Sequence, residues 1–237
     1  MFGDPTGHYS DGLATTLVTM GLLSGLFAVY AGMVRNGKNM PEYLRNAADT
    51  YQSNILNVPV TPVIIEPKGS VNGKKWAPMY EIALKEAQLF WKNHAGISIS
   101  WNDFLVDNSG QFNEVNIGYT DGNTRSALEK FYEANGSHPV ILIGVNFHDS
   151  AGKGTMGYTP GNDEGVLTMA GARSQTIAHE LGHLFLGSGD HENNVWNIMS
   201  EGGARENVNA DIKDLILNQE QVDSARRTVS RLGWIKP

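Results

Sequence analysis

The stretch His179-Glu180-Leu181-Gly182-His183 constrains the fold and chemistry of this chain more than any other. In an α-helix of about 3.6 residues per turn, residues four apart lie on one face, so His179 and His183 can bind the same metal ion. Glu180 projects from the neighbouring strip of the helix, where its carboxylate can accept a proton from a water at the metal. This spacing predicts a zinc site on a helix.

The residues that follow supply a third candidate ligand. Gly187 can adopt a positive φ and end the helix, and His191 comes shortly after that break. Asp190 is the alternative third ligand, because zinc binds oxygen as well as nitrogen. The remaining histidines are scattered, and we expect ordinary structural roles for them: His8, His94, His138 and His148.

A methionine turn, Asn197-Ile198-Met199-Ser200, follows the third histidine. With this order of motifs, the span from Val58 to Leu232 resembles the metzincin clan of zinc peptidases. The glycine and the third histidine come later than in the clan's HExxHxxGxxH pattern, and Leu186 stands at the usual glycine position. The resemblance implies a Zn²⁺-dependent endopeptidase that hydrolyses polypeptides with a metal-activated water. It makes Glu180 the general base and Met199 the packing floor of the site.

The same resemblance and the hydrophobic patterning predict an α+β fold. We expect a metzincin-like zincin domain with a mixed, mostly parallel sheet of four to five strands, a long backing helix, an active-site helix and a C-terminal helix, preceded by a hydrophobic helix. The expected elements are a first strand at 58–65, the backing helix at 76–94, a buried central strand at 139–145, a strand at 166–169 and a final helix after a capping box at 218–221.

Two of these expectations concern the cleft. In the clan, the strand that precedes the zinc helix borders the cleft and pairs with extended substrate, so we expect Val166–Met169 to be the sheet edge. Some members also use a tyrosine after the methionine turn to stabilise the oxyanion. None follows it here, and Tyr158 is the candidate substitute, with an ordinary loop tyrosine as the alternative.

Four segments are expected along the chain: a tail at 1–11, a hydrophobic helix at 12–34, a linker at 35–57 and the peptidase domain at 58–237. The tail contains Asp4-Pro5-Thr6-Gly7, which resembles the end of the RHS-repeat shell of bacterial polymorphic toxins. That resemblance implies a toxin domain that is secreted or delivered into a target cell, with the RHS shell and an immunity protein as partners.

The segment Gly12–Val34 contains no charged residue and is long enough to span a bilayer. It is either a membrane-inserting helix or a packed one. The alternative function is therefore a membrane-inserting or pore-forming toxin module in which the zinc is structural. Two further readings are an inactive fold that binds a partner and a thermolysin-like site with Glu201 or Glu206 as the third ligand.

Composition excludes several classes of function and of metal site. A net charge of −7 and the lack of basic runs argue against nucleic-acid binding. Arg226, Arg227 and Arg231 near the end of the last helix are expected to form a solvated face. The chain has no cysteine, which excludes disulfides and thiolate zinc sites.

Overall fold

The computed structural model describes residues 54–69, 73–112, 115–117, 122–144, 147–149, 156–161, 163–201 and 211–235. They all belong to one compact unit, Tyr51–Pro237. The predicted tail at 1–11, the hydrophobic helix at 12–34 and most of the predicted linker lie outside the described residues. The first strand begins at Leu56, two residues before the predicted domain boundary. In the part of the chain that the structure describes, no helix is both long and apolar enough to cross a membrane.

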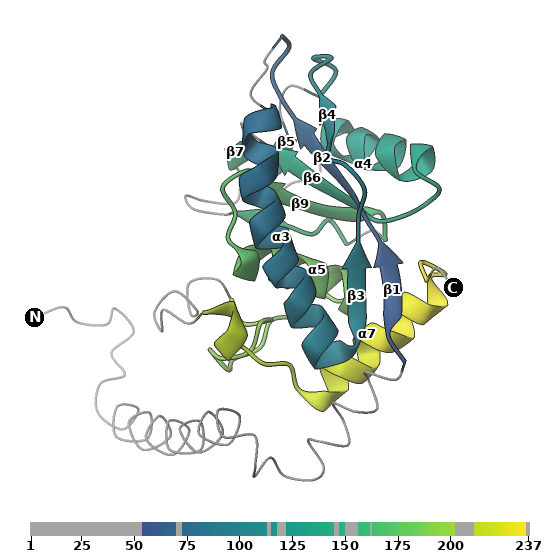
Figure 1. Ribbon diagram of the computed structural model, residues 1–237, viewed down its shortest axis with the longest axis vertical. Helices are drawn as coiled ribbons and strands as arrows, with labels where there is room; N and C mark the ends of the chain where they lie inside the picture. The colour runs from purple at the N-terminus through teal and green to yellow at the C-terminus, as the bar shows by residue number, and fades with distance from the viewer. Residues whose placement is uncertain are drawn as a thin grey trace, which may run out of the picture. The chain divides into compact units, whose positions relative to one another are not determined.

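A five-stranded sheet forms the centre of the unit (Figure 1). Its strands, in spatial order, are β4 (Leu105–Asp107), β2 (Thr61–Ile65), β6 (Val140–Gly144), β9 (Gly165–Met169) and β8 (Gly157–Tyr158). The first four are parallel, and β8 is antiparallel to β9. All five residues of β6 are buried, as expected for a central strand. The predicted α+β class with a mixed, mostly parallel sheet is therefore confirmed.

The predicted strand at 58–65 is two strands in different sheets. β1 (Leu56–Pro59) pairs with β3 (Ile97–Ser100), whereas β2 belongs to the central sheet. The chain changes sheets at Val60, whose N–H donates to the Ser100 carbonyl at 2.8 Å, while the next N–H donates to the Pro139 carbonyl. A further short pair joins β5 (Val115–Ile117) to β7 (Phe147–Asp149).

The expected sheet edge was wrong. β9 contains the predicted strand at 166–169, but it lies between β6 and β8 rather than at the end of the sheet. The edge beside it is β8, which contains Tyr158. A strand of two residues is too short to show the alternation that identifies strands in a sequence, so it could not be predicted.

The helices divide between the two faces of the sheet. The side chains of Ile64, Ile141 and Val166 share one core cluster with α3 (Gly73–Ala95), α5 (Ser174–Leu186) and α7 (Gln219–Arg231). The alternate strand residues Val63, Leu142 and Leu167 share the other cluster with α4 (Gly122–Ala134). A short 3₁₀ helix, η1 (Ile212–Asp214), precedes α7. The predicted backing, active-site and C-terminal helices correspond to α3, α5 and α7.

Glycine ends three of the described helices, including α5 at Gly187 as predicted. Gly96, Gly187 and Gly233 have φ angles of 61°, 65° and 69°, so each ends a helix in the left-handed region that favours glycine.

Arg226 is not part of a solvated face. It lies on α7 and donates to the carbonyls of Ala95 at 2.8 Å and Asn54 at 2.9 Å, capping the end of α3.

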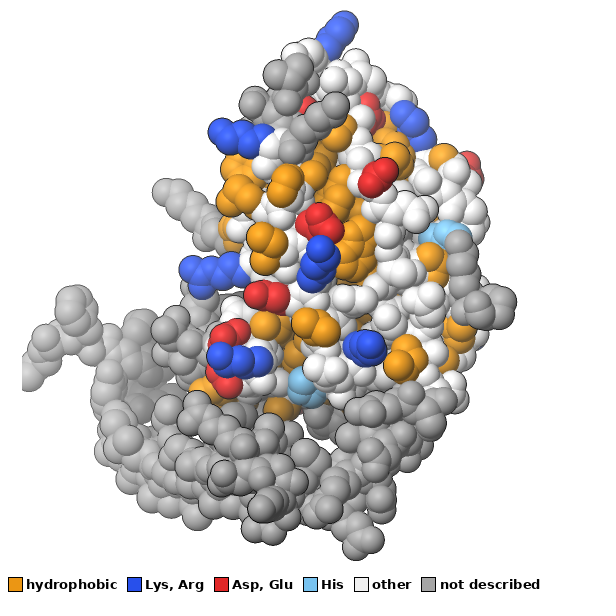
Figure 2. Space-filling model, viewed as in Figure 1, with side chains coloured by type: hydrophobic (Ala, Val, Ile, Leu, Met, Phe, Trp, Pro, Cys, Tyr) orange, Lys and Arg blue, Asp and Glu red, His pale blue; other side chains and the backbone are white. Residues whose placement is uncertain are grey.

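The outer face of α3 carries apolar side chains between charged ones, as Figure 2 shows. Met79, Ile82 and Leu89 are 61%, 64% and 53% exposed. The opposite face of this helix is the one that supports α5, because Leu84, Ala87 and Trp91 are fully buried. α3 is therefore the backing helix on which the zinc-motif helix rests.

Candidate metal centre

Helix α5 presents His179 and His183 to the same point. Their ring centroids are 4.6 Å apart and their Nε2 atoms are 3.0 Å apart. The helix is fixed against α3 by Trp91, whose indole N–H donates to the Ala178 carbonyl at 3.0 Å and whose ring meets Phe185 edge to face. His179 is buried and His183 half-buried. The two rings are thus held by a helix that is itself packed into the core.

The chain turns at Gly187 and brings His191 back to this pair. The Gly187 N–H donates to the His183 carbonyl at 2.9 Å, which closes the last turn of α5. The His191 ring lies 5.2 Å from the ring of His179, within 7° of parallel, and 4.9 Å from that of His183. One ligand nitrogen from each of the three lies within 4.8 Å of the others, so the cluster is close enough to bind a metal ion. His191 is exposed and opens the cluster to solvent.

The hydrogen bonds of the helical pair fix where their protons are. Nδ1 of His179 lies 2.7 Å from the Ile198 carbonyl, and Nδ1 of His183 lies 2.8 Å from the Ser188 carbonyl. A carbonyl oxygen can only accept, so both Nδ1 atoms carry hydrogen. In the neutral rings, each Nε2 then holds a lone pair. Two lone pairs that face each other across 3.0 Å repel unless a proton or a metal ion lies between them.

This spacing fits a tetrahedral ion. Imidazole nitrogens bound at about 2.0–2.1 Å in a tetrahedron lie about 3.3 Å apart, close to the separation of the His179 and His183 Nε2 atoms. The carbonyl bonds at Nδ1 also resemble the hydrogen bonds that orient histidine ligands in metal proteins. The residues that are present therefore fit a bound divalent metal.

The alternative ligands are directed elsewhere or lie outside the described residues. Asp190 accepts from the Ser188 hydroxyl at 2.7 Å and is exposed. Neither it nor the exposed Glu201 belongs to the cluster that the described residues form. Glu206 falls in the range 202–210, which the structure does not describe. The structure thus places His191, rather than Asp190, beside the helical pair.

Glu180 lies on α5 against strand β8. Its side chain is 6% exposed, and the Thr159 hydroxyl lies 2.9 Å from both its Oε2 and its main-chain oxygen. A β-carbon on Gly157 would stand only 2.6 Å from Cγ of Glu180 and 2.8 Å from its Oε1. A side chain at 157 would therefore displace Glu180, and the sheet edge and Thr159 together set the position of the carboxylate. The sequence did not reveal either contact, because neither residue belongs to a recognisable motif.

Tyr158 and Tyr80 differ in their position relative to the Glu180 carboxylate. Tyr158 packs against the α4 side of the sheet, as alternation along β8 requires when Gly157 faces Glu180. It therefore points away and does not serve as the oxyanion tyrosine. Tyr80 of α3 is buried and shares a short hydrogen bond with the Thr168 hydroxyl. Burial raises the pKa of Tyr80; the Thr168 bond opposes this rise, and the charge of Glu180 adds to it.

Met199 packs beneath the helical pair. It is fully buried, and a β-carbon on Gly182 would overlap its sulfur and lie 3.1 Å from its Cε. Gly182 directly precedes His183, so the methionine supports the helix at the level of the two histidines. The predicted role of Met199 as a packing floor agrees with this contact.

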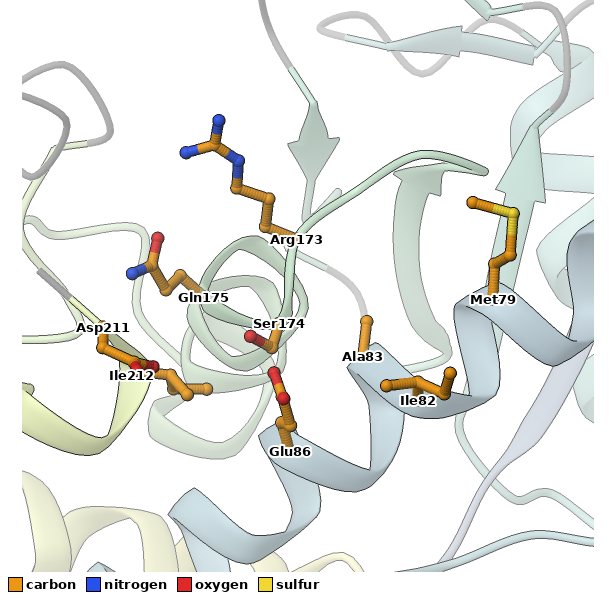
Figure 3. A pocket seen from close by; sticks show the side chains of 9 residues that line it. All are labelled: Met79, Ile82, Ala83, Glu86, Arg173, Ser174, Gln175, Asp211 and Ile212. Atoms are coloured by element: carbon orange, nitrogen blue, oxygen red, sulfur yellow. The ribbon is translucent and has the colours of Figure 1, made fainter. Parts of the chain in front are cut away.

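A separate pocket of about 400 Å³ lies between α3, the first turn of α5 and η1 (Figure 3). None of the three clustered histidines lines it. Its lining residues are Met79, Ile82, Ala83, Glu86, Arg173, Ser174, Gln175, Asp211 and Ile212. It is distinct from the metal cluster, which begins one turn further along α5.

Comparisons with known proteins do not identify a family. No family model matches the sequence, and no curated protein matches it. One solved structure, titled "Structure of a chaperone-substrate complex", is similar over 78% of this chain with 14% sequence identity and a TM-score of 0.48. The match covers 36% of the length of that chain. A likeness at this level indicates neither a family nor an activity for this chain.

Proposed function

We propose that this chain is a zinc-dependent endopeptidase with His179, His183 and His191 as metal ligands and Glu180 as the general base. The observation that carries the proposal is the pair of Nε2 atoms 3.0 Å apart, on rings whose Nδ1 atoms face carbonyl oxygens, with a third ring beside them. Catalytic zinc sites use three protein ligands and leave one position open, whereas structural sites have four. Because His191 is exposed, the open position is accessible from solvent.

The donor set supports zinc among the common ions. Ca²⁺ and Mg²⁺ prefer oxygen ligands, whereas neutral imidazole suits zinc and the later transition metals. Bound there, zinc would supply a Lewis acid that lowers the pKa of water and polarises a substrate carbonyl. No carboxylate of the described residues joins the three histidines in the cluster. Glu180 is therefore left for proton transfer rather than for metal binding.

Glu180 is placed for acid–base work by its neighbours. The Thr159 hydroxyl and the backbone at Gly157 hold the carboxylate in one orientation. In the proposed reaction, Glu180 takes a proton from the attacking water and returns it to the departing amine. A fixed carboxylate avoids the loss in rate that follows when a reacting group is misplaced by about 1 Å.

The neighbouring sheet edge supports polypeptide as the substrate. β8 is the terminal strand of the central sheet, so one side of its backbone faces away from β9. Extended peptides bind such edges by adding a strand. Because Gly157 of β8 lies against Glu180, a peptide added there would run past the general base.

The test compares wild-type protein with Glu180→Gln and with Glu201→Gln, a matched control that neutralises an exposed carboxylate near the site. Zinc content and cleavage of casein are measured, followed by proteomic identification of new termini in a lysate. We expect all three proteins to bind zinc and only Glu180→Gln to lose cleavage. Cleavage by purified Glu180→Gln at the wild-type rate would refute the role of the base. Zinc-loaded wild-type protein that cuts nothing would refute the peptidase.

The delivered-toxin context stays a prediction. The RHS shell, the immunity protein and the membrane contact all depend on residues 1–34, which lie outside the described residues. The same holds for the alternative of a pore-forming module with structural zinc. Dye leakage from liposomes caused by Glu180→Gln protein would favour that alternative.

A further inference from the structure

Gln221, in the first turn of α7, is the centre of a polar network that leads to the metal cluster. Its Oε1 accepts from the Asn218 main-chain N–H at 3.0 Å and from Asn197 Nδ2 at 2.8 Å. Its Nε2 lies 3.4 Å from Oε1 of Glu192, which also accepts from Asn218 Nδ2 at 3.2 Å. The network thus joins the N-terminus of a core helix to the segment that carries the third histidine.

Three backbone groups fix the direction of the bonds in this network, and the first is the Gln221 N–H, which holds the Asn218 oxygen at 2.9 Å and leaves the Asn218 nitrogen to donate to Glu192. The Asn218 N–H can only donate, so the Gln221 atom that meets it must be the oxygen. The Met199 N–H, 2.8 Å from Asn197, likewise requires the Asn197 oxygen and leaves its nitrogen to donate to Gln221. The Gln221 nitrogen is then left to donate to the Glu192 carboxylate. No amide in the network is free to flip without losing a bond.

One branch of the network leads to His179. Asn197 holds the Met199 N–H, and the intervening residue, Ile198, offers the carbonyl that accepts from Nδ1 of His179 at 2.7 Å. This carbonyl fixes the ring of His179 and leaves its Nε2 for the metal. Gln221 therefore acts on His179 through Asn197 and the methionine turn.

The other branch leads to His191. Glu192 directly follows this histidine, and its N–H donates to the Met199 carbonyl at 2.9 Å. The Glu192 carboxylate lies at the N-terminus of α7, where the helix dipole stabilises a negative charge. The segment 188–200 contains only isolated bridges and neither helix nor strand. Side-chain hydrogen bonds to α7 therefore hold this segment in place, since it has no helix or strand to do so.

We propose that Gln221 is a positioning residue of the metal site, which holds His191 and the carbonyl partner of His179 in register with the helical pair. The inference rests on the metal binding of the proposed function, but it does not depend on peptide cleavage. Asn197 and Gln221 are 2% and 9% exposed, so a lost bond leaves a polar group without water to replace its partner. Metal proteins commonly lose about 10- to 100-fold in affinity when such supporting contacts are removed.

Gln221→Glu separates this role from helix capping. Glutamate can still accept from the Asn218 N–H, as in an ordinary capping box, but it cannot donate and it repels Glu192. We expect affinity for Zn²⁺ to fall by about 10- to 100-fold and the visible absorption of bound Co²⁺ to change. Gln219→Glu is the matched control, because it makes the same change on the same turn, where the Gln219 side chain donates to the exposed Asp223 at 2.9 Å. It should keep wild-type affinity and spectrum.

A double variant supplies the rescue. Gln221→Glu combined with Glu192→Gln restores an amide facing a carboxylate, with the two roles exchanged. We expect the pair to recover most of the lost zinc affinity and the wild-type cobalt spectrum, which additive damage to folding would not do. Glu192→Ala, outside any helix, removes the bonds from Gln221 and Asn218 to this carboxylate, leaves both bonds of the capping box in place and should weaken zinc binding in the same direction.

Thermal melts of the metal-free proteins check folding. Equal zinc affinity and identical cobalt spectra in Gln221→Glu and Gln219→Glu would overturn the role of Gln221, as would a double variant no better than the single one. A wild-type protein that binds zinc but cleaves nothing would refute the peptidase and leave this inference intact. A wild-type protein that binds no zinc would overturn both.

Discussion

The three clustered histidines come from two regions that are held in different ways. His179 and His183 lie on α5, where backbone hydrogen bonds and apolar packing onto Trp91 and Met199 fix them. His191 lies in a segment without helix or strand, which side-chain amides tie to α7. The first arrangement is local and is encoded by a spacing of four residues. The second depends on contacts between residues that are distant in the sequence.

Because of this difference, we expect the two regions to differ in how easily they open. A buried helix opens only with the core, whereas a segment held by a few side-chain bonds can open locally at lower free energy. The helical pair should therefore define where the metal binds, and the segment 188–200 should determine how tightly it is held.

Removal of a helical ligand should be more damaging than removal of the third one. We expect His183→Ala to abolish zinc binding at equimolar metal, because a single buried imidazole remains on α5. His191→Ala should retain weaker binding by the intact helical pair. Zinc content after dialysis and competitive titration measure both, with His138→Ala as the control outside the cluster. If His191→Ala loses zinc while His183→Ala keeps it, the contrast between the two regions is wrong.

The general base can be displaced without touching the metal. A β-carbon at Gly157 would meet Cγ and Oε1 of Glu180, so Gly157→Ala should move the carboxylate. We expect cleavage to fall about a hundredfold, the effect of a misplacement of about 1 Å, with zinc content unchanged. Gly171→Ala, whose β-carbon would meet nothing within 4 Å, is the control. Unchanged cleavage by Gly157→Ala would show that β8 does not position Glu180.

The packing of Met199 beneath the helical pair should contribute to the free energy of unfolding. Gly182→Ala forces a β-carbon into Met199, and overpacking of this kind typically lowers the free energy of unfolding by about 1–3 kcal/mol. Gly189→Ala lies in the segment that carries His191, has open space around it and should be nearly neutral. Urea unfolding of the two metal-free proteins measures the difference. Equal midpoints would argue against tight packing beneath α5.

The smallest expected effect concerns the hydroxyl beside the base. Thr159→Val keeps the shape of the side chain but removes the donor to Glu180. A hydrogen bond to a charged group contributes about 1.5–3 kcal/mol, and we expect the lower end of this range, about a tenfold fall in cleavage rate. Thr159→Ser retains the hydroxyl and should restore most of the rate. A valine variant as active as the serine variant would show that the Thr159 hydroxyl does not assist Glu180.

The parts of the fold that could be predicted are those with local signals. The spacing of His179 and His183, the helix stop at Gly187, the capping box at Asn218 and the apolar run of β6 all describe neighbouring residues, and each is found in the structure. A helix places its apolar residues about every 3.6 positions, and a strand buried on both faces is a continuous apolar run. Both patterns can therefore be recognised in consecutive residues.

The parts that could not be predicted depend on distant contacts. Gln221 was expected only as a cap, and nothing in the sequence links it to Glu192 or Asn197. The edge strand β8 is two residues long, and Thr159 reaches Glu180 only because that edge packs on α5. Such pairings follow from the tertiary fold, so they become visible only when the strands and helices are assembled.

The most direct test of the central claim is X-ray absorption at the zinc edge of the wild-type protein, loaded with one equivalent of metal. We expect three imidazole nitrogens at about 2.0–2.1 Å and one further oxygen, with one imidazole fewer in His191→Ala. A wild-type spectrum that fits two imidazoles or fewer, or one that His191→Ala leaves unchanged, would contradict it.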